Sequence, residues 1–140
     1  MTFRFSAWLA CLLISFSSLA TELPPAFKKQ SGARVAAMCA ACMTLSAATM
    51  AGAKKDIDKE IDVAVLLYRV WLDRAERLGA NEADIRWSLD RLKKQPNKVT
   101  LKQIDYCVSR GHSHFEALPA DKRQALMADI EDDKARLLNP

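Results

Sequence analysis

Cysteines are the most reactive feature of this 140-residue chain. Cys39 and Cys42 stand three positions apart, so on a helix their side chains share one face, with Cβ atoms about 5–6 Å apart. A redox-active C-x-x-C pair lies at a helix N-terminus after a strand, where free backbone N–H groups lower the thiol pKa. No strand pattern precedes this pair, and position 43 is Met rather than the His of a haem-attachment motif. We therefore expect neither a dithiol oxidoreductase nor a c-type haem site.

A structural disulfide is the favoured role for these residues. Cys107 lies on a later predicted helix, and antiparallel packing would bring that helix against the first one. A bridge from Cys39 or Cys42 to Cys107 closes a loop of roughly 65 residues, which the chain-entropy account values at about 4 kcal/mol. Cys42 shares its helix face with apolar core candidates, whereas Cys39 lies beside Met43 and Met50. We favour the pair Cys39–Cys107, with Cys42 as a buried thiol and as the alternative partner.

A soft-metal site is the competing hypothesis for the same region. Thiolate, thioether and imidazole groups together suit Cu(I), and thiolates with imidazoles alone suit Zn(II). The candidate ligands are Met38, Cys39, Cys42, Met43, His112 and His114. Methionine in an alanine-rich helix is typically a gap-filling core residue, and two histidines in a loop are typically solvated. We therefore favour no metal and no other cofactor.

Sequence patterns of enzymatic catalysis are missing. The chain has no G-x-S-x-G element, no H-E-x-x-H helix and no glycine-rich phosphate loop. Trp71 and Trp87 suit a core or an interface better than a cofactor cage. The dipole at a predicted helix start accounts for four closely spaced acids, Asp56, Asp58, Glu60 and Asp62. The sequence therefore predicts a protein that is not an enzyme.

The first twenty residues have the pattern of an export signal. Arg4 precedes an apolar run over residues 6–16, and Ser18 and Ala20 supply the small residues of a cleavage site after Ala20. The residues before Cys11 do not fit a lipidation site. We expect a periplasmic or secreted protein without a permanent membrane anchor, in a compartment that oxidises its remaining cysteines.

The composition of the whole chain limits the class of protein to which it can belong. Apolar residues make up 50% and charged residues 27%, which excludes disordered and low-complexity classes and suits one compact domain. The formal net charge is +4, from 21 basic and 17 acidic residues of interspersed sign. Such mixed charge does not predict a nucleic-acid partner.

Apolar spacing predicts helices throughout, after an extended leader over residues 21–30. The expected helices run from Ser31 to Ala51, from Asp56 to Leu78, from Asn81 to Pro96, from Leu101 to near Gly111, and from Pro119 onward. Asp56 and Asn81 are the expected N-caps, and Gly79 is the expected stop of the central helix. The apolar stripe of this central helix, which predicts burial on more than one side, comprises Ile57, Ile61, Ala64, Tyr68, Trp71, Ala75 and Leu78, flanked by Val63, Leu66, Leu67 and Val70.

Local patterns refine the later helices. Thr100 and Gln103 form a capping box, and Val99 and Ile104 form a hydrophobic staple, which together predict a helix start at Leu101. The third helix has a core stripe of Ile85, Leu89 and Leu92, and the last has an apolar face of Leu126, Met127, Ile130 and Leu137 opposite acids at positions 131–133. Strand patterns are missing. The predicted fold is all-α, a compact disulfide-stapled bundle of about five helices that forms one domain over residues 31–140.

Two resemblances to known proteins rest on these features. Val99-Thr100-Leu101-Lys102-Gln103 resembles the L-T-x-x-Q element of small periplasmic helical stress chaperones, and residues 118–124 resemble a degenerate second copy. The cysteines depart from the pattern of those chaperones. The signal peptide, helical body and early-to-late cysteine placement resemble the periplasmic immunity proteins that neutralise secreted cell-wall-degrading amidases. Neither resemblance identifies a family.

The sequence thus predicts a small exported, non-enzymatic helical protein that binds another protein in the periplasm or outside the cell. Immunity or inhibitor-type binding is the leading hypothesis, and chaperone-like binding of unfolded clients follows it. The alternative is a soft-metal carrier that uses Cys39 and Cys42. The sequence leaves open which residues contact the partner and what the oligomeric state is.

Overall fold

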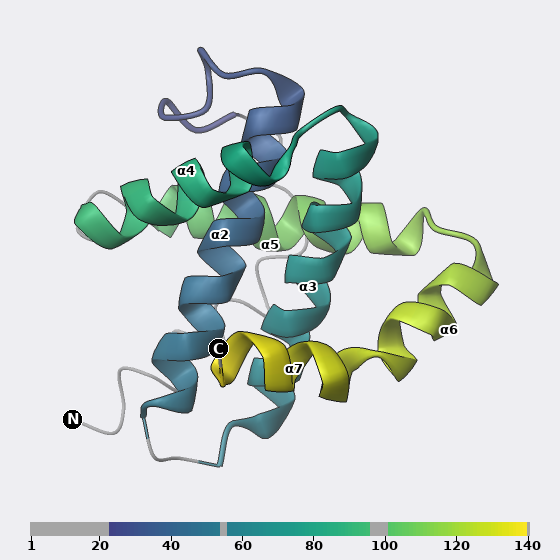
Figure 1. Cartoon of the computed structure of the whole chain (residues 1–140). Helices are drawn as coiled ribbons and strands as arrows, with labels where there is room; N and C mark the ends of the chain where they lie inside the picture. Colours follow the sequence, from purple (N-terminus) through teal and green to yellow (C-terminus); the bar gives the residue numbers. More distant parts are fainter. Residues whose placement is uncertain (1–22, 54–55, 96–100, 140) are drawn as a thin grey trace.

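The computed structural model describes residues 23–53, 56–95 and 101–139, and in this part of the chain it contains helices and no strand. The helices are α2 (Gly32–Ala51), α3 (Asp58–Arg77), α4 (Glu82–Lys94), α5 (Leu101–Glu116), α6 (Ala120–Ala128) and α7 (Ile130–Leu138) (Figure 1). The prediction of an all-α fold with a disulfide is confirmed. The export signal, Pro96, Val99 and Thr100 lie outside the described residues.

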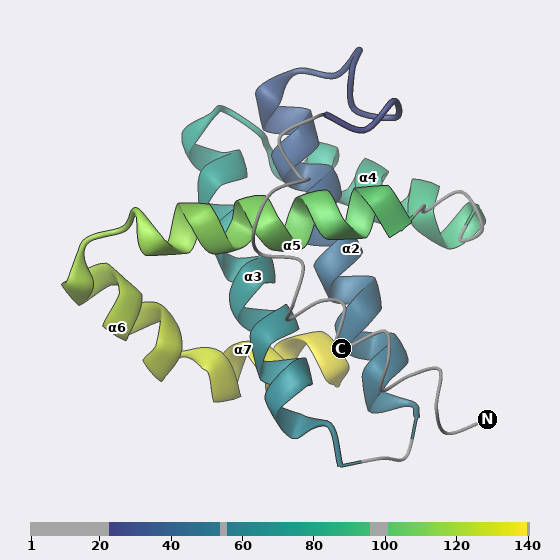
Figure 2. The ribbon, with the colours of Figure 1, turned by 180° about the vertical axis from the view of Figure 1, so that it is seen from behind.

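Helices α2 and α3 form an antiparallel pair at the centre, and most of the other helices lie across it (Figure 1). Helices α4 and α7 cross one face of the pair, and α5 crosses the opposite face, as the reverse view in Figure 2 shows. Helix α6 connects α5 to α7 at the edge of the molecule. The arrangement leaves α2 covered from several sides.

Small side chains allow this covering of α2. Its N-terminus is capped by Ser31, whose Oγ accepts a hydrogen bond from the backbone N–H of Arg34 at 3.2 Å. Alanines with almost no exposed surface line the helix, and because they are short, α3, α4 and α5 can approach closely. These alanines are Ala36, Ala37, Ala40, Ala41 and Ala47.

Helix α2 is also the one helix in the described part of the chain that is long and apolar enough to cross a membrane. Composition alone does not support the expectation of a protein without a permanent membrane anchor, because residues 35–53 carry no charge. In the structure, the apolar side chains of α2 instead form the centre of the hydrophobic core. Burial inside the bundle therefore accounts for the hydropathy of this helix.

The segment before α2 is not an extended leader, contrary to the prediction. Residues 25–29 form turns, in which the backbone N–H of Phe27 donates to the carbonyl oxygen of Pro24 at 2.9 Å. Phe27 is almost completely buried, edge-on against the ring of Tyr106 in α5. The chain folds back here because burial of this large aromatic side chain stabilises the turns.

Helix α3 begins two residues later than predicted, and Asp56 is not its N-cap. Ile57 holds the cap position without a side-chain hydrogen bond. Gly79 is confirmed as the stop, with a φ of 91° that favours glycine. Most of the predicted stripe is buried or half-buried, but Leu78 is 46% exposed and the flanking Val63 is 48% exposed. These two residues lie near opposite ends of α3.

Asn81 caps α4 as predicted. Its side-chain oxygen accepts from the backbone N–H of Asp84 at 3.0 Å, and Asp84 accepts from the backbone N–H of Asn81 at 3.0 Å. The helix ends at Lys94. Its expected core stripe is only half-buried, and Ser88 is its one buried residue. Helix α4 thus lies on the surface of α2 rather than within the core.

Helix α5 does not stop near Gly111, as the sequence predicted, but continues to Glu116. Gly111 lies where α5 crosses α3. A Cβ atom at this position would come 2.8 Å from Nε1 of Trp71 and 3.1 Å from Cδ2 of Leu67. The glycine therefore permits close approach of two helices and does not end one.

The predicted last helix is two helices. The chain bends at Asp129, where φ is −87° and ψ is −1°. The bend returns α7 to the central pair, where Ile130 and Leu137 pack against a second core cluster of Ala47, Ile61, Ala64 and Val65. It also changes which residues face water: Met127 is 48% exposed, whereas Asp133, expected on the solvent side, is buried.

The crossing at Gly111 generates a stability prediction. We expect Gly111→Ala to lower the free energy of unfolding by about 1–3 kcal/mol, because the new methyl group overpacks the contact with Trp71. This loss occurs although alanine has the higher helix propensity, by about 1 kcal/mol. Thermal and urea denaturation followed by circular dichroism would measure it.

Gly52→Ala is the matched control, because Gly52 has a φ of −74° and a Cβ there would make only ordinary contacts at 3.6 Å. We expect its stability to stay within about 0.5 kcal/mol of the parent. Equal stability of the two alanine variants would contradict the close crossing of α3 and α5.

Candidate functional site

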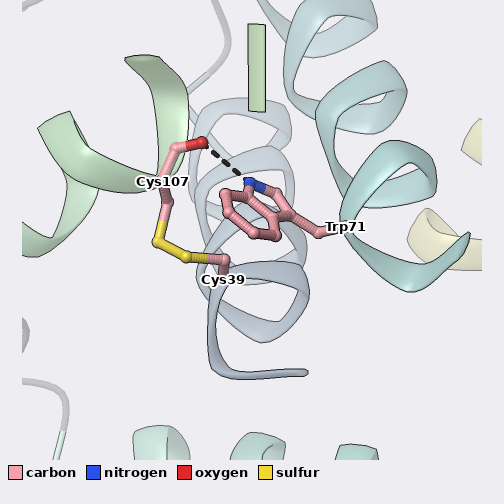
Figure 3. Close-up of a disulfide and its surroundings, with 3 residues drawn as sticks. All are labelled: Cys39, Trp71 and Cys107. Carbon is pink, nitrogen blue, oxygen red and sulfur yellow. Dashed lines mark hydrogen bonds between the residues drawn. A yellow bond between two sulfur atoms is a disulfide. The ribbon is translucent and has the colours of Figure 1, made fainter. Parts of the chain in front are cut away.

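The Cys39–Cys107 disulfide joins α2 to α5 across a sequence separation of 68, with the two Cα atoms 5.2 Å apart (Figure 3). It is the pair favoured from the sequence. Both cysteines are fully buried. On the other side of Cys107, the indole Nε1–H of Trp71 donates to the backbone carbonyl oxygen of Cys107 at 2.8 Å. One residue of α5 is thus held covalently to α2 and by a hydrogen bond to α3.

Cys42 is a buried free thiol. Removal from water disfavours the thiolate and raises the pKa of Cys42 to about 12. The thiol therefore keeps its proton at neutral pH. In that state Cys42 is neither a nucleophile nor a soft-metal ligand, because both roles need the thiolate.

The six candidate metal ligands do not form one donor set. The sulfur of Cys39 is in the disulfide, and Met38 and Met43 are packed in the core. His112 and His114 are two positions apart on α5, so their side chains point to different sides of the helix. In the described residues, no group of three or more His, Cys, Asp or Glu side chains is placed to hold a metal ion.

The remaining sequence candidates have structural roles in the described region. Asp58 and Glu60 lie in the first turn of α3, and Asp62 pairs with Lys134 of α7 at 3.0 Å. Trp71 is buried in the core. Trp87 lies half-buried beneath two guanidinium groups, with the Cζ atoms of Arg34 and Arg91 at 4.2 and 5.2 Å from its ring.

The structure reveals a pocket that the sequence did not indicate, between the C-terminal parts of α3 and α5. Its volume is about 210 Å³. We call it the α3–α5 pocket, and its lining residues are Val70, Asp73, Arg74, Arg77, Leu78, His114, Ala117 and Leu118. Sites for cofactors and other small molecules usually have volumes of about 300–1,000 Å³. The α3–α5 pocket is therefore closer in size to a site for one side chain of another protein.

Positive charge dominates the rim of this pocket. Asp73 is its one acidic lining residue, and this carboxylate pairs with Arg77 at 2.7 Å. His114 packs edge-on against Trp71, with ring centroids 5.1 Å apart. Partial burial, and the nearby charges of Arg74 and Arg110, lower the pKa of His114 below its usual 6.5. The imidazole is accordingly neutral at pH 7 and lies in a positive field.

A second hollow lies on α4. All its described lining residues come from this one helix: Glu82, Ala83, Arg86, Trp87 and Asp90. A surface formed by one helix does not enclose a ligand. Its lining residues carry two acids, Glu82 and Asp90, against one base, Arg86, which pairs with Glu82 at 2.8 Å. The α4 hollow is therefore the weaker candidate for a binding site.

Helix α6 directly follows the α3–α5 pocket in the chain and buries none of its residues. An isolated helix of nine residues is marginal in water, and packing normally stabilises such short helices. Its side chain at Met127 is nearly half exposed. The pocket and α6 together make a surface whose packing is incomplete within this chain.

Sequence reasoning missed this site for two reasons. It assigned Leu78 to the core, and it ended the helix near Gly111, before His114. One signal was present, because Arg74 lies four positions before Leu78, so both are on the same face of α3. A cation on the apolar stripe indicates that this end of the stripe faces water.

No protein-family model matches this chain, nor does any curated protein or solved structure. Function has to be inferred from the residues of the α3–α5 pocket and the surface around it.

The disulfide leads to a prediction on stability. We expect Cys39→Ser and Cys107→Ser each to lower the free energy of unfolding by about 4 kcal/mol, because each opens the same loop. The double variant should lose no more than either single variant. Urea unfolding would measure all three. Cys42→Ala leaves the disulfide intact and should lose much less, and additive losses for Cys39 and Cys107 would refute the pairing.

The electrostatics of the pocket lead to a second prediction. In an NMR titration we expect the midpoint of His114 to lie below 6.5, and Arg74→Gln to raise it, because one repulsive charge is removed. Because the pKa of His114 is lower in the folded chain than in the unfolded chain, the unfolded chain binds a proton more readily as the pH falls below 6.5. The contribution of His114 to the free energy of unfolding is therefore lost as the pH falls below 6.5. An unchanged midpoint in Arg74→Gln would show that Arg74 does not act on His114.

Proposed function

We propose that this chain is a small exported protein that binds one partner protein, as an inhibitor or immunity protein does, and catalyses no reaction. The observation that carries the proposal is the α3–α5 pocket, which has the size of a side chain and an unbalanced positive rim. Helix α6 beside it supports the proposal, since none of its residues is fully buried within the chain. The contact surface proposed is the pocket together with α6.

Export is supported from two directions. The first twenty residues have the pattern of a cleavable signal, and the disulfide suits an oxidising compartment such as the periplasm. In such a compartment the bundle keeps its covalent link between α2 and α5. A prearranged surface loses less conformational freedom on binding, which favours affinity for one partner.

Binding of one partner is favoured over chaperone-like binding of many clients. A chaperone needs a continuous apolar surface that adapts to different sequences. The large exposed apolar residues of the described chain are instead separated along it, at Val63, Leu78, Leu101 and Met127. Scattered single residues of this kind are usual on a soluble protein. The charged pocket is the more specific feature.

The soft-metal carrier alternative finds no support in the geometry. Its two central ligands would be the thiolates of Cys39 and Cys42. In the oxidised protein the first is in a disulfide and the second is held protonated by burial. Metal uptake would need reduction of the disulfide and opening of the core.

Site-specific photo-crosslinking tests the proposed function. A photoreactive phenylalanine analogue would replace Leu78, at the pocket, in the producing cells, and its matched control would replace Val63. Both residues lie on the α3 segment and have almost equal exposure, 46% and 48%. We expect one discrete adduct from position 78 and none from position 63, with 1:1 stoichiometry when the purified partner is recombined.

Two results would overturn this proposal. Many adducts of different mass from both positions would indicate chaperone-like binding. No adduct from position 78, while position 63 gives one, would place the contact surface at the other end of α3.

A further inference from the structure

The α3 side of the α3–α5 pocket carries apolar side chains at its two ends, Val70 and Leu78, and charged side chains between them. Along α3 its lining residues follow a helical stripe from Val70 to Leu78, and Ala117 and Leu118 of the α5–α6 turn face them. Eight positions on a helix span about 12 Å. An extended segment rises about 3.3 Å per residue, so three to four residues would lie along this stripe. The pocket therefore takes one side chain, while the stripe along α3 is long enough to contact the neighbouring residues of an extended segment.

The positive charges around this pocket exceed what the fold itself requires. Arg74 and Arg77 lie in the last turn of α3, where cations offset the helix dipole. That account does not apply to Arg110, which lies within α5. Arg77 is already paired with Asp73 at 2.7 Å. In the described part of the chain, neither Arg74 nor Arg110 has a carboxylate within 4.0 Å.

The nearby acids do not supply the missing partner. Glu116, which directly precedes the lining residue Ala117, has His112 at 3.6 Å and Arg123 at 3.5 Å. The pocket has a volume of about 210 Å³, apolar lining at Leu78 and Leu118, and the guanidinium of Arg74 among its lining groups, so it complements a carboxylate next to an apolar side chain. Charge complementarity of this kind steers association and selects between partners.

We infer that the α3–α5 pocket binds an acidic residue, flanked by an apolar residue, in an exposed segment of the partner protein. The apolar side chain packs on Val70, Leu78 and Leu118, and the carboxylate pairs with Arg74 at the rim. This inference rests on the proposed function and adds the chemistry of the recognised segment. His114 reports on the same event, since a bound carboxylate offsets the charges of Arg74 and Arg110 beside it.

Defined peptides test the inference without the partner. The probe is N-acetyl-Leu-Glu-amide, titrated into the isotope-labelled full chain while backbone amide shifts are recorded. N-acetyl-Leu-Gln-amide is the matched probe without charge, and N-acetyl-leucine carries only a terminal carboxylate. We expect saturable shifts at Arg74, Leu78 and His114 with the glutamate peptide, and affinity about tenfold lower for the glutamine peptide.

Two protein variants complete the test. Arg74→Glu should weaken binding of the glutamate peptide about tenfold or more, and Arg74→Gln should weaken it less. Arg86→Glu makes the same charge change at the α4 hollow and should leave the affinity within twofold. The glutamate peptide should also raise the titration midpoint of His114. The amide spectrum of each variant shows directly that it is folded.

Each contrary result has a distinct meaning. Equal affinity for the glutamate and glutamine peptides, or normal binding by Arg74→Glu, would overturn the inference. Loss of binding in Arg86→Glu alone would move the site to α4. Binding of N-acetyl-leucine alone would assign the pocket to a chain end and overturn the choice of an internal segment. A discrete crosslinked partner at position 78 alongside any of these results would leave the proposed function standing without this inference.

Discussion

The crossing of α5 over the α2–α3 pair is the contact on which the rest of the structure depends. Two different interactions meet at Cys107: its sulfur is bonded to Cys39 of α2, and its carbonyl oxygen accepts from the indole of Trp71 in α3. One turn later, Gly111 allows the same indole to approach the α5 backbone. The position of α5 is therefore fixed by the disulfide, by the buried hydrogen bond and by the absence of a side chain at Gly111.

This fixed crossing explains why the candidate site is where it is. Beyond Gly111, α5 continues past the edge of the central pair and carries His114 to the C-terminal end of α3. The pocket forms between these two helix ends, where His114 also packs against Trp71. The bend at Asp129 then returns the chain to the core while α6 stays outside. The same helix arrangement therefore fixes α5 on the core and leaves α6 and the pocket exposed.

The residues with the most reactive side chains are not the residues of the proposed contact surface. The residues that looked most reactive in the sequence, the cysteines and methionines of α2, are those that the fold removes from water. Helix packing brings Cys39 and Cys107 together as a disulfide between helices, and burial keeps Cys42 protonated. The groups left on the proposed contact surface are arginines and apolar side chains of low reactivity. Such a surface recognises charge and shape, which agrees with a binding role.

The sequence by itself determined the helical class, the Asn81 cap and the Gly79 stop, because those depend on apolar period and on neighbours a few positions away. It favoured Cys39 as the partner of Cys107 but left Cys42 as an alternative, because that bond joins distant segments. Only the tertiary structure decided the burial of Phe27, the exposure of Leu78 and the role of Gly111. Each of these depends on a side chain from a distant segment, such as Tyr106 against Phe27 or Trp71 against Gly111. The α3–α5 pocket belongs to the same class, because residues about forty positions apart line it. The spacing of residues along the chain predicts a helix, whereas the burial of its side chains depends on which distant segments pack against it.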